Sequence, residues 1–515
     1  MSANTASGVR VRMYRQGLGD CFLISFPREG GGRFHLMIDF GVLLGTANAE
    51  ERMKKVARSI ALETGGSADG KMKGKVDVLV ATHEHWDHVS GFVQARDEIT
   101  GLIDVGEVWM AWTEDPNHPL ANELRQDRKR KVAHLHAAAA RLRGDTAMGD
   151  AAQGIEGLLG FFGARAEGGS TADAMKSLSE RPESRVVYRK PGEPVFTLPG
   201  VEGVRVYVLG PPEDRKLIKK SDPTKRGREV YEFASALSLA DTFFAGVALG
   251  LDDEGKGALA GAEMDPDAAD LAFPFDRRYR IETEAARKLR VRKKGGGSCH
   301  FFREFYGFDA AGQGEGGDDG ESPAWRRIDS DWLGVAQDLA MALDSDTNNT
   351  SLALALELGE GGPVLLFPGD AQVGNWLSWQ SLSWPADPKR PDGAKITTDD
   401  LLRRTILYKV GHHGSHNATL REQGLEKMTS PQLVALIPVD QEMARKKKWA
   451  MPFGSLYERL KARTRGRLIR VDQGRLPFDE AAKYGLTRAE WEEFERRTPA
   501  DPDGEALWIE YHLGG

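Results

Sequence analysis

The stretch VDVLVATHEHWDH, residues 76–88, decides which fold and chemistry we expect of this chain. Its first six residues are rich in β-branched and apolar side chains, which predicts a buried strand. Three histidines and one aspartate follow that strand within six positions. A solvated loop has no need of three imidazoles, whereas imidazole and carboxylate groups are ligands that Zn²⁺ and Mn²⁺ accept. The stretch therefore predicts a metal site at a strand end.

The spacing within this motif favours two ions. His83 and His85, two residues apart, can converge on one ion. Asp87 and His88 would then face a second ion, at the separation of about 3.5–4 Å that is usual in two-metal hydrolases. The alternative is a histidine-rich surface turn without a bound ion.

Two further motifs follow apolar runs late in the chain. Asp370 comes after residues 364–367 and a Pro-Gly turn, and one carboxylate can bridge two ions. His412 and His413 follow the run at residues 405–410, which suggests one metal ligand and one group aimed at substrate. Taken alone, Gly-Asp after a strand is usually an ordinary turn, and for the second segment a turn with incidental histidines is the less favoured alternative.

Composition bounds the function. A chain of 515 residues is too long for one compact domain, and 40% hydrophobic residues are enough for a sizeable core. Lys and Arg number 70 against 77 Asp and Glu, so nucleic-acid binding would have to rest on a local patch. No run of eighteen apolar residues predicts a membrane span, and the first residues lack an apolar leader, so we expect a cytoplasmic protein. Cys21 and Cys299 are expected to be free thiols.

Strands interleaved with helices predict an α/β sandwich. Strands are expected at residues 9–14, 76–81, 204–209 and 405–410, and an Arg/Lys-rich helix at residues 117–145. The pattern weakens over residues 213–345, which we interpret as an insertion with a flexible Gly/Asp-rich loop near residues 309–322.

The order of the motifs resembles the metallo-β-lactamase superfamily, whose hallmark is H-x-H-x-D-H after a strand. Within it, the chain is most similar to the hydrolase domain of the DNA-uptake protein ComEC and its soluble relatives. The segments that carry the resemblance are GLGD at 17–20, IDFG at 38–41, HEHWDH at 83–88, NTSL at 349–352, GDA at 369–371 and KVGHHGS at 409–415.

The resemblance implies an αββα sandwich with a large insertion. Residues 1–212 would form its first half, with a helical excursion at 113–185. Residues 346–515 would form the second half and a C-terminal extension, on either side of the 213–345 insertion.

The resemblance also implies roles for individual residues. His83, His85 and Asp370 would hold the first of two Zn²⁺ or Mn²⁺ ions. The second ion would be held by Asp87, His88, Asp370 and one of His412 and His413. We favour His413 as the ligand and His412 as the phosphate-facing group, although the two could exchange. Asp87 and His412 are the expected catalytic residues. Around the ligands, Asp39 would orient a histidine, Asp20 would fix a turn, and Asn349 and Ser351 would complete the surrounding shell.

One departure concerns the first ion. Many superfamily members supply it with a further histidine, and the equivalent residues 346–351 contain none, a lack that the ComEC-like group shares. His118, His134, His136 and His300 are candidates in principle, although each is expected on a helix or loop without a metal role. The first ion is therefore expected to be weakly held.

These features favour a metal-dependent phosphodiesterase or nuclease that uses a metal-bridging hydroxide. Nucleic acid could be tracked by three basic clusters, which are Arg125, Arg128, Lys129, Arg130, Lys131, Arg141 and Arg143; Arg287, Lys288, Arg290, Arg292, Lys293 and Lys294; and Arg445, Lys446, Lys447 and Lys448. Each cluster could equally be a solvated surface. One alternative function is hydrolysis of a small ester, lactone or thioester. Another is a partner-binding role in a larger bacterial system, such as a defence system, with the 213–345 insertion as the interface.

Overall fold

The computed structural model describes residues 8–67, 70–142, 155–163, 169–181, 183–220, 281, 283–306, 335–385, 395–502 and 506–514. The chain divides into two compact units. The larger contains Met1–Lys129, Gly157–Glu232 and Met341–Gly515, and the smaller contains Arg130–Glu156 and Phe233–Ala340. The loop predicted near residues 309–322 lies outside the described residues, and the predicted domain boundaries stay predictions.

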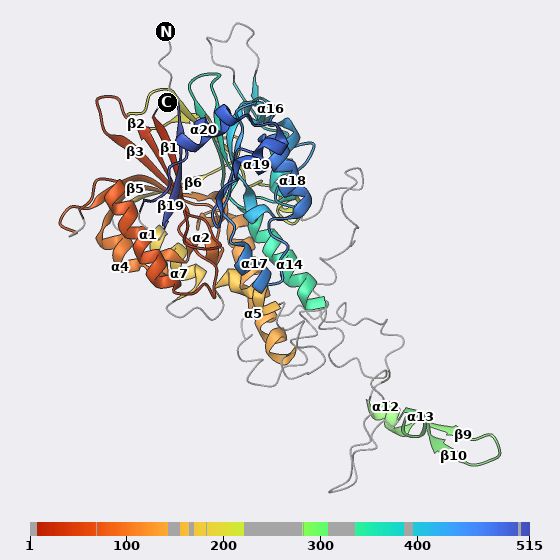
Figure 1. The fold of residues 1–515 in the computed structure, drawn as a ribbon. Coiled ribbons are helices and arrows are strands. Elements are labelled where there is room, and N and C mark those ends of the chain that lie inside the picture. The colour runs from red at the N-terminus through yellow and green to blue at the C-terminus, as the bar shows by residue number, and fades with distance from the viewer. Residues whose placement is uncertain are drawn as a thin grey trace. The chain divides into compact units, whose positions relative to one another are not determined.

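The larger unit is a mixed α/β structure built on two large sheets (Figure 1). The 7-stranded sheet has the order β19-β1-β2-β3-β4-β5-β6. Its neighbours are antiparallel from β19 to β3 and parallel from β3 to β6. Its strands are β1 (Val9–Tyr14), β2 (Phe22–Pro27), β3 (Arg33–Ile38), β4 (Gly74–Ala81), β5 (Ile103–Ala111), β6 (Arg185–Arg189) and β19 (Trp508–Leu513).

The 8-stranded sheet has the order β18-β17-β16-β15-β12-β11-β8-β7. Its centre, from β12 to β17, is parallel, and the flanking pairs are antiparallel. Its strands are β7 (Phe196–Thr197), β8 (Val204–Gly210), β11 (Ala353–Leu358), β12 (Val364–Phe367), β15 (Thr405–Lys409), β16 (Val434–Ile437), β17 (Leu468–Arg470) and β18 (Gly474–Arg475). The strands expected at 9–14, 76–81, 204–209 and 405–410 are confirmed within a residue or two.

Side chains of each strand alternate between two apolar clusters, as the pleat requires. Val206 and Val208 of β8 belong to a cluster that also contains Val11 and Val80 from the other sheet. Tyr207 and its β8 neighbours on the opposite face belong to a second cluster. Both faces of these strands are therefore buried, which explains why they are apolar runs rather than alternating polar patterns.

Helices cover the outer faces of the two sheets. Met53, Val56 and Ile60 of α1 pack with the outer face of the 7-stranded sheet. Trp376 and Trp379 of α15 pack with the outer face of the 8-stranded sheet. The helices of the described chain include α1 (Ala49–Glu63), α2 (Trp86–Val89), α3 (Gly91–Gln94), α4 (Arg96–Gly101), α5 (Pro119–Leu142), α7 (Thr171–Ser179), α8 (Arg215–Ile218), α14 (Val335–Asn348), α15 (Val373–Trp379), α16 (Thr398–Arg403), α17 (Gln441–Lys446), α18 (Gly454–Arg463), α19 (Phe478–Ala481) and α20 (Arg488–Arg496).

Smaller elements complete the described chain. The helix predicted at residues 117–145 is confirmed as α5, which is described to Leu142. A short antiparallel pair with two flanking helices lies within the 213–345 segment; these elements are α12 (Thr283–Lys288), β9 (Arg290–Arg292), β10 (Ser298–His300) and α13 (Phe301–Tyr306). A second short pair is β13 (Ser383–Trp384) with β14 (Ile396–Thr397). Among the described residues, no helix combines the length and apolar character needed to cross a membrane.

The parallel strands bring the predicted motifs to strand ends. Asp39 follows β3, and the motif at residues 83–88 follows β4, its parallel neighbour. In the other sheet, Asp370 follows β12 and His412 follows β15, again a parallel pair. Because parallel strands end at the same edge of a sheet, functional side chains of different segments collect there.

Candidate metal centre

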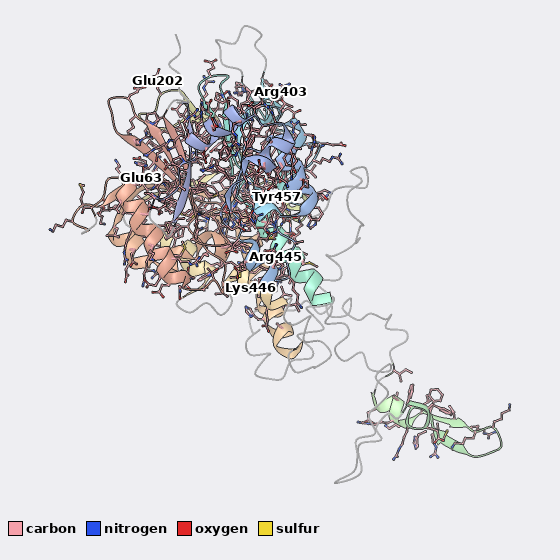
Figure 2. The ribbon with its side chains drawn as sticks, in the orientation of Figure 1. Glu63, Glu202, Arg403, Arg445, Lys446 and Tyr457 are labelled. Carbon is pink, nitrogen blue, oxygen red and sulfur yellow. The ribbon has the colours of Figure 1, made fainter. Side chains whose placement is uncertain are left out.

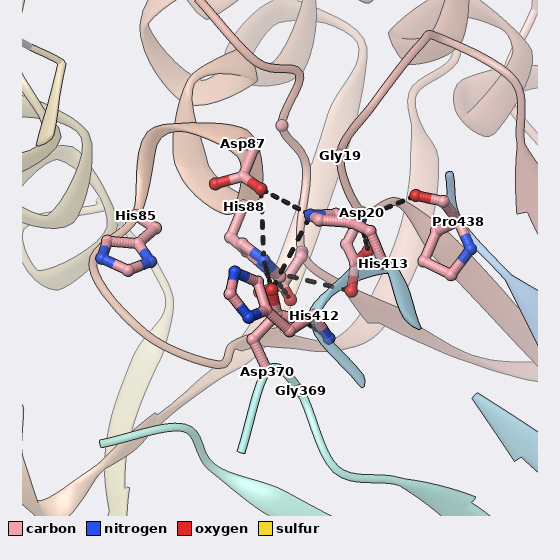
Figure 3. A network of polar contacts seen from close by, with 12 residues as sticks. Gly19, Asp20, His85, Asp87, His88, Gly369, Asp370, His412, His413 and Pro438 are labelled. Carbon is pink, nitrogen blue, oxygen red and sulfur yellow. Dashed lines mark hydrogen bonds and ion pairs between the residues drawn. The ribbon is translucent and has the colours of Figure 1, made fainter. Parts of the chain in front are cut away.

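Four predicted ligands converge in the structure. Asp87, His88, Asp370 and His413 each offer a ligand atom, and these atoms lie within 4.8 Å of one another (Figure 3). All four side chains are buried. Of the two neighbouring histidines, it is His413 that joins this group.

Local backbone geometry allows this convergence. His412 and His413 both have positive φ angles, of 42° and 51°, where most residues are strained. Because the backbone turns sharply here, the side chains of His412 and His413 lie in different parts of the site. Gly41 permits another close approach, since a Cβ there would lie 2.4 Å from the backbone carbonyl carbon of Asp87.

The imidazoles of His88 and His413 are held by acceptors on their outer sides. His88 donates from Nδ1 to Asp39 Oδ2 at 2.8 Å, and His413 donates from Nδ1 to the carbonyl oxygen of Pro438 at 2.7 Å. Both Nε2 atoms therefore face the shared acids, with 3.1 Å between His88 Nε2 and Asp370 Oδ2. A carboxylate or carbonyl behind the imidazole is the usual support of a metal-binding histidine.

His83 is held by hydroxyl groups. The Thr82 hydroxyl donates to Asp39 Oδ2 at 2.7 Å, so it must accept from His83 Nδ1, 3.1 Å away. Ser351 Oγ lies 3.3 Å from the same nitrogen. The His83 proton is therefore on Nδ1, and the Nε2 lone pair faces His85 Nδ1 at 3.0 Å.

Ser351 and Asn349, both predicted to surround the ligands, have different roles in the structure. Ser351 lies within the site, because its hydroxyl also accepts from the backbone N–H of Asp370 at 3.0 Å. Asn349 instead anchors the chain around the site. Its side-chain amide donates to the carbonyl oxygens of Ile218 and Lys220, and its Oδ1 accepts from the backbone of Asn375.

Lys409 is a buried cation that the sequence interpretation did not assign to the site. Its ammonium contacts Asp20 Oδ2 at 2.5 Å and Asp370 Oδ1 at 2.8 Å. Asp20, expected to fix a turn, thus also lies among the ligands, with 3.7 Å between its Oδ2 and His88 Nδ1. Lys409 thus bridges two buried acids, and Asp370 contacts Lys409 through Oδ1 and His88 through Oδ2.

His412 lies beside the ligand group with a defined proton position. The side-chain amide nitrogen of Gln372 can only donate, so His412 Nδ1 accepts from it at 3.0 Å. Asn417 fixes the orientation of Gln372 by donating to its Oε1 at 2.8 Å. A neutral His412 therefore carries its hydrogen on Nε2. Gln372 and Asn417 each lie within a few residues of a predicted motif, at 369–371 and 409–415, but no local pattern identifies them as site residues.

Asp344 is another site residue without a sequence signal. It lies on α14 and is 6% exposed. Its Oδ1 is 3.8 Å from His85 Nε2, and its Oδ2 is 4.0 Å from His412 Nε2. Burial and the charges of Asp87 and Asp370 raise the pKa of Asp344 well above its usual value.

The two groups of histidines differ in their electrostatics. Burial lowers the pKa of His85 to about 3 and that of His412 to about 4. Burial also opposes the charge on His88, but the surrounding carboxylates, led by Asp370 and Asp87, outweigh it and raise the pKa of His88 well above the usual value. The same balance raises the pKa of His413.

Several buried nitrogen and oxygen atoms of the site lack hydrogen-bond partners. They are His85 Nε2, His88 Nε2, Asp87 Oδ1, Asp20 Oδ1 and Asp344 Oδ1. An unsatisfied buried polar atom is costly, and native proteins keep few of them. Imidazole and carboxylate groups with free ligand atoms, in the numbers found here, fit divalent cations.

Other candidates from the sequence lie elsewhere. His118 packs on Trp112 near the start of α5, His134 and His136 lie on α5, and His300 lies on β10. Within the described chain, none of these belongs to a group of potential metal ligands. Trp86 and Trp112 are fully buried and Trp109 is 2% exposed, so all three are core residues.

The aromatic wall of the site comes from residues outside the predicted motifs. Phe161 lies 5.5 Å from the His85 ring and 6.4 Å from the His412 ring, measured between centroids. Half-buried Trp449 stacks on Phe161 with a centroid distance of 5.0 Å and an interplanar angle of 17°. Trp449 directly follows the third basic cluster, in which Arg445, Lys446 and Lys448 are exposed. Figure 2 labels Arg445 and Lys446 of this cluster.

The first basic cluster is partly neutralised. Arg128 is paired with Glu84, the residue between His83 and His85, and Glu84 also accepts from Thr171 Oγ1 at 3.0 Å. Arg125 donates to the backbone oxygens of Thr113 and Asp115. These two arginines therefore support the site region instead of presenting free charge.

Comparison of the chain with protein-family models and with curated proteins gives no match. The chemistry of the site consequently has to be argued from its own geometry. A buried set of acids and imidazoles can bind cations, and His412 Nε2 can donate a hydrogen bond to a group bound beside it.

Proposed function

We propose that this protein is a dinuclear metal-dependent hydrolase that acts on phosphodiesters, with an αββα sandwich of the metallo-β-lactamase type. The observation that carries the proposal is the charge buried at the site. Five aspartates are buried there around two imidazoles and one ammonium, and this acidic setting raises the pKa of His88 and of His413, whose protons divalent cations would replace. The aspartates are Asp20, Asp39, Asp87, Asp344 and Asp370, and the ammonium is that of Lys409.

The arrangement of layers supports the fold part of the proposal. One apolar cluster contains residues of both sheets, and the two other large clusters combine one sheet each with helices. The motifs lie at strand ends, where this superfamily is expected to carry its metals.

The ligand geometry directly supports one ion, at the group of four converging side chains, and the spacing of the HEHWDH motif suggests a second. Asp87, His88 and His413 would hold one ion and His83 and His85 the other, with Asp370 shared. When bound, such ions lower the pKa of water and stabilise the negative charge that develops on a phosphate. Asp39 and the Pro438 carbonyl would keep the ligand nitrogens of His88 and His413 directed at the ion.

His412 supplies the donor that a phosphodiester requires. Gln372 keeps the His412 hydrogen on Nε2, and the lowered pKa keeps the imidazole neutral at pH 7. A neutral N–H beside the metals can donate to a non-bridging phosphate oxygen, or to the leaving oxygen as it departs. Lys409 would reduce repulsion between Asp370 and an anionic substrate by keeping its charge paired.

The third basic cluster and Trp449 favour a nucleotide or nucleic-acid substrate over a small neutral ester. Arg445, Lys446 and Lys448 are exposed, and Trp449 follows them in the sequence. Trp449 stacks on Phe161, whose ring lies near the ring of His412. Cationic side chains that track phosphates and rings that stack on bases are the usual elements of single-strand binding.

The test combines metal analysis with a substrate panel. The purified chain is assayed for bound metals and then, with Mn²⁺ or Zn²⁺, for hydrolysis of bis-p-nitrophenyl phosphate, single- and double-stranded DNA, RNA, cyclic dinucleotides and a lactone. We expect about two metal equivalents and activity on phosphodiesters that falls steeply with salt for nucleic acids. Absence of any metal binding, or activity on the lactone alone, would refute the proposal.

A further inference from the structure

The proposed first-ion site has fewer ligands than its neighbour. His83 and His85 supply two imidazoles, and Asp370 is shared with the second ion. The segment at residues 346–351, where the resemblance leads one to expect another histidine, has none. These three protein ligands are the number that catalytic Zn²⁺ sites use and one fewer than structural sites use, and one of the three is shared, so the site has room for a further ligand.

Asp344 lies just before that segment and faces the site. It is on α14, and its side chain is buried between the imidazoles of His85 and His412. Asn348, one helical turn later, donates from Nδ2 to Asp344 Oδ2 at 3.1 Å. This contact fixes the carboxylate and leaves its Oδ1 without a partner.

The atom that faces Asp344 Oδ1 is also an acceptor. His83 Nε2 carries a lone pair, so the 3.0 Å contact requires a hydrogen on His85 Nδ1, a contact that binding of an ion by His83 would replace. The neutral His85 ring then has a lone pair on Nε2, which lies 3.8 Å from Asp344 Oδ1. Both atoms are buried, and neither has a hydrogen-bond partner.

The distance between these two acceptors suits a cation. At 3.8 Å the pair is too long for a hydrogen bond. Two atoms that each bind one Zn²⁺ at about 2.1 Å lie at most about 4.2 Å apart. Phe161 and Phe162 pack on the His85 ring, with centroid distances of 5.5 and 5.0 Å, and shield this position from bulk water.

We infer that Asp344 is a ligand of the first ion together with His85, in place of the missing histidine. This inference rests on the proposed metal-dependent function. A carboxylate in place of an imidazole shifts the preference of a site from Zn²⁺ towards Mn²⁺. The first ion is therefore held more tightly as Mn²⁺ than a site with three imidazoles would hold it.

The test is metal stoichiometry and affinity, measured without reference to activity. Wild type, Asp344→Asn, Asp344→Ala and the control Asp346→Asn are titrated with Mn²⁺ and with Zn²⁺ by calorimetry, and metal content is measured after gel filtration. Asparagine preserves the size and one acceptor oxygen but is a poor ligand. We expect two equivalents for wild type and the control, and loss or at least tenfold weakening of one equivalent in both Asp344 variants.

The outcomes separate the two proposals. Wild type without bound metal would refute the metal-dependent function itself. Two equivalents with unchanged affinity in Asp344→Asn would refute the ligand role of Asp344 alone, because a residue that merely accepted a hydrogen bond from His85 would be replaced by the asparagine oxygen. Thermal unfolding of the metal-free proteins verifies folding, and loss of a buried charge should leave Asp344→Asn at least as stable as wild type.

Discussion

The two halves of the proposed metal centre differ in how firmly their imidazole groups are held. Around His88 and His413, each outer nitrogen has an acceptor at 2.7 or 2.8 Å, and four ligand atoms already converge. Around His85, the outer nitrogen Nδ1 contacts another proposed ligand, His83 Nε2, at 3.0 Å and has no carboxylate or carbonyl behind it. The protein therefore orients the imidazoles of one half more firmly than those of the other, although both halves keep buried atoms, such as His88 Nε2 and His85 Nε2, without a hydrogen-bond partner.

The largest effect is expected from removing an acid that both halves share. Asp370→Ala should lower hydrolysis of bis-p-nitrophenyl phosphate on the order of 10³-fold, and Asp87→Ala by a similar factor, because each removes a carboxylate that would hold the ions that stabilise the reacting group. Turnover of purified variants at saturating Mn²⁺ provides the measurement. Asp399→Ala, which removes a half-buried acid of α16 that pairs with Lys427, is the control; full activity in both site variants would show that the centre is not catalytic.

A buried histidine outside both halves gives a reference for what burial does without an ion. His35 is 7% exposed, its Nδ1 is 3.0 Å from Ser25 Oγ, and burial lowers its pKa to about 4. As pH falls below about 6.5, the unfolded chain takes up a proton that the folded protein refuses. The free energy of unfolding should therefore fall by about 3 kcal/mol between pH 7 and pH 4.

Urea unfolding of metal-free wild type and His35→Gln across this pH range measures that contribution as a difference. The variant should lose this part of the pH dependence while keeping its metal affinity. Parallel stability curves for the two proteins would contradict the assignment of the lowered pKa to His35.

The organised half can be weakened by removing the acceptor behind a ligand. Asp39→Ala leaves His88 Nδ1 and the Thr82 hydroxyl without their partner. We expect metal affinity to fall by about 10–100-fold, the usual cost of such a loss. Calorimetric titration gives the constant, and Asp77→Ala, at an ion pair with Arg28 on the same sheet, is the matched control that should bind metal as wild type does.

The smallest expected effect concerns the donor beside the metals. Gln372→Ala removes the amide that donates to His412 Nδ1 and leaves this nitrogen with the Ser415 hydroxyl at 2.8 Å. A hydroxyl can donate or accept, so the hydrogen no longer has a fixed position on Nε2. Turnover should fall about tenfold with metal content unchanged, within the range of general acid–base contributions. The neighbouring variant Gln380→Ala should leave turnover intact. A drop in metal content in Gln372→Ala would instead mean that Gln372 supports the ligands.

The strands and motifs that depend on neighbouring residues alone could be predicted from the sequence. The apolar runs of β4 and β15 predict strands because both their faces are buried, and the motifs follow these strands directly. The roles of His412 and His413 could not be separated from sequence, because positive φ angles at both positions decide where each side chain points. Asp344, Lys409 and Trp449 were missed as site residues, because only packing between distant segments brings them to the site.

The pairing of β1 with β19 has a consequence for synthesis. Val9 of β1 is opposite Leu513 of β19, so the two partners are separated by almost the whole polypeptide. While the ribosome is still translating, β1 presents an open row of amide and carbonyl groups on that side. A nascent chain therefore keeps this edge of β1 unpaired until β19 has been synthesised, a state that favours aggregation.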